Sequence, residues 1–252
     1  PRDPHYHEAE FQMHYDTALY GALRDIGHGH APAEKIFEAL DDAVWQGFPE
    51  SAVHLRYIEN HDETRYLKEC SEAALRAATA ATFTLPGAPM IYYGQERGMT
   101  AQRGPMKWYD GDADLTEFHR SLSTLRREQP ALKNGGVERL SVDVAERRDP
   151  APESAPAASD ATADIVAANG SGEPAGADRV VAYARDDGND RLLVVLNFDD
   201  EPQAVSLPEP VGSTDLRTGG PLRKRYPADD GAADADRDSY LLVDDVVVCQ
   251  PA

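Results

Sequence analysis

The first half of the chain alternates short apolar runs with longer stretches of helical periodicity. Residues 11–15 are a short strand candidate, and residues 53–58 alternate apolar and polar side chains as a strand does. Residues 89–93 are a short apolar run between glycines, which predicts a buried strand. Helices are predicted at residues 17–26, 32–46, 71–85 and 115–128. This alternation of strands and helices indicates parallel βα units over residues 1–134.

The helix predicted at residues 32–46 has clear end signals. Pro32 stands at a favoured first helical position, and Gly47 follows the last residue. The apolar residues of this segment fall at helical spacing, at Ile36, Phe37, Leu40, Val44 and Trp45. The later helix at 71–85 is rich in alanine and is stopped by a Pro-Gly pair.

From residue 135 onward the pattern changes to strands separated by turns rich in Asp, Gly, Asn and Pro. The predicted strands are residues 180–185, 191–198, 203–207 and 239–248. Residues 187–190 have the composition of a hairpin connection. The sequence therefore predicts an antiparallel β-sandwich over residues 135–252. Within it, a flexible acidic insertion near 149–177 and a similar stretch at 228–237 are rich in Ala, Gly and Asp.

The three predicted parallel strands are too few to close a barrel. A (β/α)8 barrel needs eight strands and typically ~250 residues, whereas three parallel strands leave two unpaired edges. The strands therefore belong either to a small open sheet or to a barrel whose first five units are absent. Length and topology leave both interpretations open.

The charge balance narrows the classes of partner. Asp and Glu number 45 against 25 Lys and Arg, which gives a net charge of -20. Nucleic acids and anionic membrane surfaces both favour basic proteins, so both are disfavoured as partners. Lysine is scarce, at Lys35, Lys68, Lys107, Lys133 and Lys224. Abundant acid with scarce lysine resembles the composition of a salt-adapted, haloarchaeal-type protein, although any acidic domain gains solubility from its charge.

The cysteines, the histidines and the apolar runs add few constraints. Cys70 and Cys249 lie far apart and are predicted to be free thiols. The histidines at His5, His7, His14, His28 and His30 follow no zinc spacing, so they are interpreted as ordinary polar residues. No run approaches the ~18 apolar residues of a membrane span, and no signal peptide is recognised. The location is left between cytoplasmic and secreted, with a preference for cytoplasmic.

The strongest chemical signal is Asn60-His61-Asp62, which ends the strand predicted at 53–58. Catalytic side chains of parallel barrels project from this end of a strand. The segment resembles the last conserved region of the α-amylase superfamily (glycoside hydrolase family 13), in which an apolar strand ends in Asn-His-Asp. Residues 87–96 resemble the eighth barrel strand of that family, and residues 97–108 resemble the loop after it.

This resemblance implies a fold and a reaction. The fold is α/β: the last three βα units of a (β/α)8 TIM barrel, followed by an all-β antiparallel sandwich as the C-terminal domain. The reaction is retaining hydrolysis of α-glucans or maltooligosaccharides, with a nucleophile and a general acid about 5 Å apart. In the family these two carboxyl groups follow the fourth and fifth strands. Both are therefore expected before Pro1, and residues 1–252 alone are expected to be inactive.

The resemblance also assigns roles to individual residues. Asp62 matches the third carboxylate of the family, which holds sugar hydroxyls and stabilises the cationic transition state. His61 is expected to donate to the same hydroxyls, and Asn60 is expected to orient the loop. Arg65 is expected to pair with a carboxylate in or near the site, or else to form an ordinary surface salt bridge.

Three further residues have two interpretations each. Tyr93 is expected to line the sugar site or to be a core residue of its strand. Arg103 and Trp108 are expected to border substrate subsites or only to pack within their loop.

Glu8 and Glu10 follow the place where a fifth strand would end, but the family's acid is expected just before Pro1.

Two other functions stay open at this level. The chain is alternatively a non-catalytic carbohydrate-binding or partner subunit with an amylase-like barrel, or an α-glucan transglycosylase. The intact Asn60-His61-Asp62 speaks against the first, and acceptor-site geometry would decide the second. No metal ligand or cofactor is assignable in this segment, although calcium stays an option for a full-length protein. The expected partners are a glucan substrate and the missing N-terminal part of the same barrel.

Overall fold

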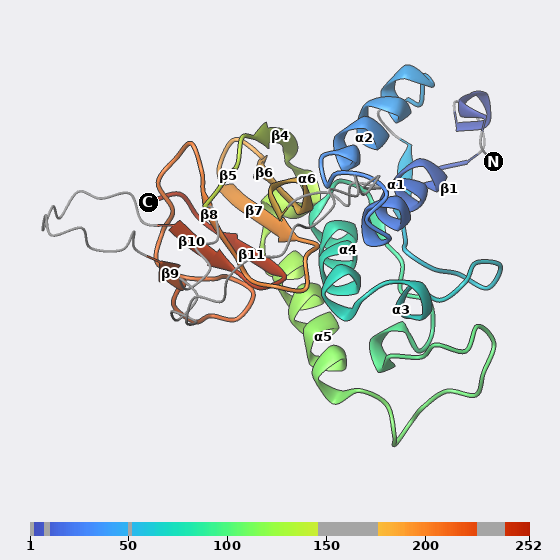
Figure 1. Cartoon of the computed structure of the whole chain (residues 1–252). Helices are drawn as coiled ribbons and strands as arrows, with labels where there is room; N and C mark the ends of the chain where they lie inside the picture. Colours follow the sequence, from blue (N-terminus) through green and yellow to red (C-terminus); the bar gives the residue numbers. More distant parts are fainter. Residues whose placement is uncertain (1–2, 8–10, 50–51, 146–175, 226–239) are drawn as a thin grey trace, which may run out of the picture.

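The computed structural model describes residues 3–7, 11–49, 52–145, 176–225 and 240–252. A part with helices and short strands lies on one side of the molecule, and an all-β part lies on the other (Figure 1). Almost all of the insertion predicted near 149–177, and the whole of that at 228–237, fall outside the described residues.

Three short strands form a parallel sheet in the first part. They are β1 (Met13–Tyr15), β2 (Val53–Arg56) and β3 (Ala88–Pro89), hydrogen-bonded in the order β1-β2-β3. His14 pairs with His54, and Leu55 pairs with Ala88. Parallel neighbours cannot be joined by a tight turn, so the connections from β1 to β2 and from β2 to β3 must be crossovers.

Helices supply these connections. The helices α1 (Thr17–Gly27) and α2 (Lys35–Trp45) connect β1 to β2, and α3 (Tyr66–Glu69) and α4 (Glu72–Thr84) connect β2 to β3. The helices α5 (Ala113–Glu128) and α6 (Pro130–Asn134) follow β3 and lead into the second part. Asp16, Ser71 and Asp112 cap α1, α4 and α5, because their side-chain oxygens accept backbone N–H groups at 2.9, 3.2 and 2.7 Å. The predicted order of parallel βα units is confirmed.

The turn from α4 into β3 requires a glycine. Gly87 has a φ of +117°, a conformation that L side chains rarely adopt. A Cβ at this position would collide with the carbonyl oxygen of His54, the residue that precedes Leu55 in the neighbouring strand. Gly87 therefore lets β3 approach β2 closely.

Two elements of the first part differ from their predictions. The strand predicted at 89–93 is reduced to Ala88–Pro89, and Ile91 and Tyr93 are partly exposed. Within the described residues β3 pairs on one edge only, and Gly94, with a φ of +81°, then turns the chain away. The helix predicted from residue 32 begins at Lys35. Its last turn extends beyond the core, because Trp45 is 87% exposed.

The second part contains two antiparallel sheets. One is ordered β11-β7-β6-β4 and consists of β4 (Gly136–Leu140), β6 (Val180–Asp186), β7 (Arg191–Asn197) and β11 (Val246–Cys249). The other is ordered β5-β8-β10-β9 and consists of β5 (Asp143–Val144), β8 (Gln203–Ser206), β9 (Lys224–Arg225) and β10 (Tyr240–Val243). Three short 3-10 helices, Pro4–His7, Gln95–Arg97 and Gly176–Arg179, complete the described elements.

The prediction of one strand at residues 239–248 is wrong. This segment forms two strands, β10 and β11, which belong to different sheets. The chain changes sheet at Asp244 and Asp245, where the buried side chain of Asn197 holds the corner. Its Nδ2 donates to the carbonyl oxygens of Val243 at 3.2 Å and Asp244 at 2.9 Å. The backbone N–H of Asn197 donates to Asp245 at 2.9 Å. An apolar run on both sides of the corner conceals this change of sheet from the sequence pattern.

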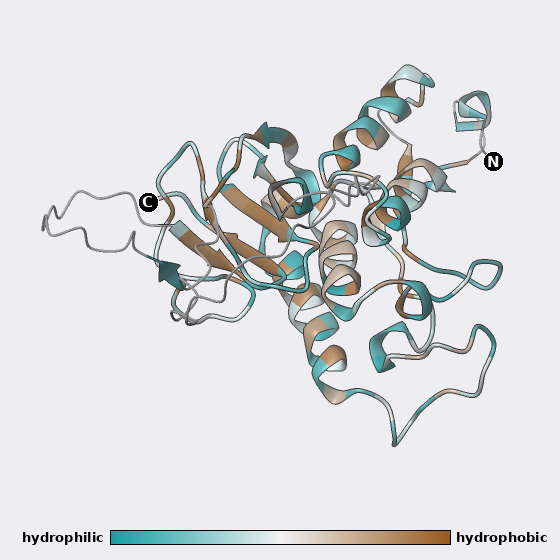
Figure 2. Cartoon of the chain, in the orientation of Figure 1, coloured by the Kyte–Doolittle hydropathy of each residue, from teal (hydrophilic) through white to brown (hydrophobic). Residues whose placement is uncertain are grey.

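The two central strands of the sheet β11-β7-β6-β4, β6 and β7, are buried on both faces. Leu193 and Val195 of β7 pack between the two sheets, whereas Leu192, Val194 and Leu196 pack into the core that the helices form. Burial on both faces explains why β7 is a continuous apolar run (Figure 2). The two parts of the chain therefore share one hydrophobic core.

Two arginines, the buried Arg185 and the partly buried Arg126, strengthen the same junction. Arg185 donates to the carbonyl oxygens of Thr84, of Gly135 at 2.6 Å and of Gly136 at 3.1 Å. Arg126 donates to Phe83 at 2.6 Å, to Leu132 at 2.8 Å and to Gly87 at 2.5 Å. Burial lowers the pKa of Arg185 to about 10. These bonds fix the end of α4 and the turn that leads into β3.

The remaining sequence-based expectations about the fold concern thiols and membranes. Cys70 and Cys249 are both free, as predicted, and burial raises the pKa of each. Within the part of the chain that the structure describes, none of the helices combines the length and apolar character that crossing a membrane requires.

Candidate functional site

The candidate site lies where the chain leaves the carboxyl end of β2. Tyr57, Ile58 and Glu59 continue from the strand and are buried. The next residues emerge at the surface, where the side chains of His61 and Asp62 are 61% and 70% exposed. This end of a parallel strand is where catalytic groups of (β/α)8 barrels project.

The side chain of Asn60 fixes the conformation of the loop through hydrogen bonds to its backbone. It is almost fully buried, and its Oδ1 accepts the backbone N–H of Asp62 at 2.8 Å and that of Glu63 at 3.2 Å. Such bonds from a side-chain oxygen to the next backbone amides form a local turn. The turn presents His61 and Asp62 side by side, with His61 Nε2 at 3.1 Å from Asp62 Oδ2.

The loop after β3 contacts this turn. Arg103 places Nη2 at 3.5 Å from Asp62 Oδ1. The same guanidinium donates to the carbonyl oxygen of His61 from Nε at 3.2 Å and from Nη2 at 3.0 Å. Gln102 adds a bond from Nε2 to that carbonyl at 3.2 Å. The structure thus brings Asp62, His61 and Arg103 into one exposed polar cluster.

Arg65 lies beneath this cluster and is fully buried. Its Nη1 pairs with Glu59 Oε1 at 2.6 Å, and its guanidinium lies 4.3 Å from the ring centre of Tyr92 and 4.9 Å from that of Tyr93. A surface salt bridge is therefore excluded for Arg65. The alternative, a carboxylate partner near the site, is what the geometry shows.

Tyr93 and Trp108 belong to the second loop in different ways. Tyr93 is partly exposed rather than a core residue, and its hydroxyl donates to the carbonyl oxygen of Gly104 at 2.9 Å. Trp108 has an exposed side chain, while its carbonyl oxygen accepts a bond from Arg97 Nη2 at 3.3 Å. Of these two, Tyr93 lies nearer the cluster, through its contact with Arg65.

Glu59 is a residue of the site that the sequence reasoning missed. Both of its oxygens have partners, because Oε2 accepts the backbone N–H of Tyr66 at 2.7 Å. Burial raises the pKa of Glu59, and the bonds from Arg65 and Tyr66 act in the opposite direction. The available signal was a carboxylate inside an apolar strand end with an arginine six positions later.

The cluster can accept and donate hydrogen bonds to hydroxyl groups. Asp62 supplies a carboxylate, His61 an imidazole and Arg103 a guanidinium, which together suit a polyhydroxylated ligand. Among the residues that the structure describes, no group of three or more His, Cys, Asp or Glu side chains is arranged to hold a metal ion. Glu8 and Glu10 lie outside the described residues.

The histidines named from the sequence lie elsewhere. His14 stacks on Phe48 with ring centres 4.1 Å apart, and it meets His7 at 4.7 Å and His54 at 4.5 Å in edge contacts. Burial and the neighbouring imidazoles lower the pKa of His14 to about 4. These rings pack β1 and β2 against the 3-10 helix Pro4–His7 and the loop before β2.

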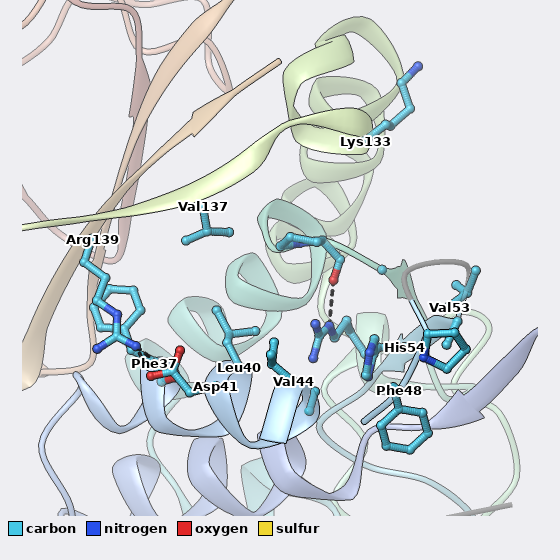
Figure 3. Close-up of a pocket in the computed structure, with 16 residues that line it drawn as sticks. Phe37, Leu40, Asp41, Val44, Phe48, Val53, His54, Lys133, Val137 and Arg139 are labelled. Carbon is cyan, nitrogen blue, oxygen red and sulfur yellow. Dashed lines mark hydrogen bonds and ion pairs between the residues drawn. The ribbon is translucent and has the colours of Figure 1, made fainter. Parts of the chain in front are cut away.

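A pocket of about 680 Å³ lies away from the Asn60 loop. Figure 3 shows Leu40, Val44 and Val137 around it, with Arg139 and Asp41 paired at one end and His54 at the other. Its lining includes Val53 and His54 at the amino end of β2, Arg56 at the last position of that strand, and Pro86 and Gly87 just before β3. Because barrel chemistry occurs at carboxyl ends, we do not assign the reaction to this pocket.

Comparisons with known proteins identify a family profile and relatives that this chain resembles. Residues 10–153 match the family profile described as alpha amylase, catalytic domain. The chain is 38% identical over 242 residues to the alpha-amylase MalA of Haloarcula japonica, which covers 96% of this chain and 32% of that protein. It is 34% identical over 132 residues to neopullulanase 2 of Thermoactinomyces vulgaris, covering 48% of this chain and 22% of that protein.

Solved structures share the fold. The maltogenic alpha-amylase AmyB of Thermotoga neapolitana superposes with a TM-score of 0.70 at 20% identity, over 99% of this chain and 52% of that one. A cyclomaltodextrinase gives a TM-score of 0.66 at 21% identity, over 100% of this chain and 39% of that one. The chain therefore spans about a third of its haloarchaeal relative and about half of a solved structure. A relative from Haloarcula japonica also agrees with the haloarchaeal-type composition.

Proposed function

The chain belongs to the α-amylase family of glycoside hydrolases, and on this premise we propose that Asp62 is the transition-state-stabilising carboxylate of a retaining α-glucan hydrolase. Residues 1–134 form the last part of the catalytic barrel in this proposal, and residues 135–252 form the C-terminal β-domain. The substrate is an α-glucan or a maltooligosaccharide, the class to which the names of the relatives point.

One observation carries the proposal: Asp62 and His61 are exposed side by side at the carboxyl end of β2. A retaining glycosidase passes through an oxocarbenium-like transition state, in which positive charge develops on the sugar ring. A fixed carboxylate that binds the adjacent hydroxyls favours that charge. His61 donates to the same hydroxyls, and Arg103 borders the place where the sugar would lie.

We propose further that the nucleophile and the general acid come from barrel units outside residues 1–252. The chain spans 32% of the length of its haloarchaeal relative, which leaves room for those units in a longer protein. The sheet also fits such an arrangement. Met13 and Tyr15 of β1 are 45% and 46% exposed, whereas His14 between them is buried. An exposed apolar face beside an edge strand is unfavourable alone, and the N-terminal part of the same barrel would cover it.

The test is Asp62→Asn in the complete protein, assayed with starch and maltooligosaccharides. We expect kcat to fall by about 10²–10³-fold, the scale seen when a transition-state contact is removed. Asp110→Asn, an exposed carboxylate of the loop before α5, is the matched control and should keep its activity. Hydrolysis by Asp62→Asn within twofold of the unaltered protein would refute the assignment.

A further inference from the structure

A buried ion pair brackets the Asn60-His61-Asp62 turn. Glu59 comes directly before the turn and is 1% exposed, and Arg65 comes three residues after it and is 0% exposed. Glu59 Oε1 lies 2.6 Å from Arg65 Nη1, and Glu59 Oε2 accepts the N–H of Tyr66 at 2.7 Å. The carboxylate therefore fastens the far end of the loop to its beginning.

Arg65 also fastens this loop to the loop after β3. Its Nε donates to the carbonyl oxygen of Ala101 at 3.1 Å, and its guanidinium lies over Tyr92 at 4.3 Å. In return, Gln102 and Arg103 donate to the carbonyl oxygen of His61. Each loop thus donates to the backbone of the other, and Arg65 is the buried member of this exchange.

The energetics of the buried Glu59–Arg65 pair indicate that it orients the loop more than it stabilises the fold. Taking two charges out of water costs about as much as their attraction returns, so apolar residues would stabilise the loop base equally well. Burial does raise the pKa of Glu59, as expected for a carboxylate withdrawn from solvent. The pair instead fixes the orientation of the loop. The planar guanidinium of Arg65 can bond to Glu59 and Ala101 at fixed angles while it lies on Tyr92.

We propose that Glu59 and Arg65 are positioning residues that set the orientation of Asp62 and His61 without touching substrate. The proposal rests on the proposed function of Asp62. It gives Arg65, for which the sequence predicted a carboxylate partner or a surface salt bridge, a positioning role, and it adds Glu59 as that partner. A displaced Asp62 would lose contacts that strengthen in the transition state, so kcat should fall while KM changes little.

The test compares Glu59→Gln, Arg65→Lys and the double variant Glu59→Gln/Arg65→Met in the complete protein. Glu59→Gln leaves Arg65 buried without its counter-ion, so its Tm should fall. Arg65→Lys keeps the charge but loses either the bond to Ala101 or the contact with Tyr92. The double variant removes both charges, so its Tm should recover. In all three we expect kcat to be about 10–100-fold lower, with KM changed less than threefold, at a temperature where each is folded.

The matched control is Glu72→Gln/Arg76→Met, which removes the partly exposed Glu72–Arg76 pair of α4, where the two charges lie 2.7 Å apart. Its kcat should stay within twofold. A Glu59→Gln/Arg65→Met variant with recovered Tm and unchanged kcat would overturn the proposal, because the pair would then be only structural. Asp62→Asn distinguishes the two proposals. If Asp62→Asn remains active, the proposed function fails, whereas an inactive Asp62→Asn beside an active double variant refutes the positioning role alone.

Discussion

Arg103 contacts Asp62 across two loops: its Nη2 lies 3.5 Å from Asp62 Oδ1, although one residue follows β3 and the other follows β2. The exposed charges of the candidate site are therefore held by two neighbouring strands of the sheet. Among the described residues, Arg103 is the arginine or lysine that lies nearest to the carboxylate on which the proposed chemistry depends.

We expect Arg103→Gln to weaken substrate use moderately. Both side chains are about 70% exposed, and exposed pairs contribute up to ~1 kcal/mol, so kcat/KM should fall about two- to fivefold. Steady-state kinetics on maltooligosaccharides in the complete protein measure this. Arg120→Gln, from an exposed pair with Glu117, is the control and should leave kcat/KM unchanged. A loss as large as that of Asp62→Asn would contradict a border role.

Residues 1–252 alone should not hydrolyse α-glucans. The proposed nucleophile and general acid lie outside this chain, and Asp62 by itself supplies only stabilisation of the transition state. The measurement is reducing-sugar release by the purified chain, with circular dichroism to establish that it is folded. The complete protein in the same assay is the positive control. Turnover by residues 1–252 above the uncatalysed rate would show that the chain contains its own catalytic pair.

Protonation of His14 should destabilise the fold in acid. The pKa of His14 is lowered from 6.5 to about 4, so between these values the unfolded chain binds more protons than the folded one. The contribution of His14 to the free energy of unfolding should rise from pH 4 to pH 6.5 and then level off. Around His14 stand His7, His54 and Arg56, which oppose its protonation, and Asp16, which contacts His54 and Arg56.

Urea unfolding at several pH values measures the effect. His14→Phe keeps a ring on Phe48 but cannot titrate, so its free energy of unfolding should depend less steeply on pH in this window. His30→Gln, at an exposed position, should follow the unaltered protein. Equal slopes for His14→Phe and the unaltered protein would show that His14 does not contribute.

Gly87→Ala should be far more disruptive than Gly188→Ala. Both glycines have positive φ, at +117° and +86°, so alanine is strained at each, by about 1 kcal/mol. At Gly87 the new Cβ also collides with the backbone of His54, whereas nothing lies within 4 Å at Gly188. We expect a loss of about 3 kcal/mol for Gly87→Ala, measured by urea unfolding. Equal losses for the two variants would mean that β3 can move away from β2 without cost.

Salt should stabilise the protein. With a net charge of -20, carboxylates repel one another, and the screening length falls to about 3 Å at 1 M salt. The Tm should rise as KCl increases from dilute buffer to molar concentration. At pH 4, where part of the carboxylates are protonated, the same titration should give a smaller rise. A Tm independent of KCl at pH 7 would argue against salt adaptation.

The sequence by itself determined the local elements and the motif. The periodicities of residues 17–26, 71–85 and 115–128 predicted three helices to within two residues at each end. The repeated order of strand and helix predicted the parallel sheet, and Asn60-His61-Asp62 pointed to the family that the comparisons show. Such features depend on residues near one another in the chain, where one-sided burial leaves a periodic pattern.

The tertiary structure alone decided which distant residues meet. Arg65 is buried on Glu59 instead of lying at the surface, and the apolar run of 239–248 is divided between two sheets at the corner that Asn197 holds. Trp45 continues the helical periodicity of α2 but is exposed. A pattern of apolar positions indicates that a side chain can be buried. Which residue it then contacts depends on how surfaces from separate parts of the chain pack together. For the same reason, the sequence marked Asp62 as a candidate site residue, and only the fold showed which side chains contact it.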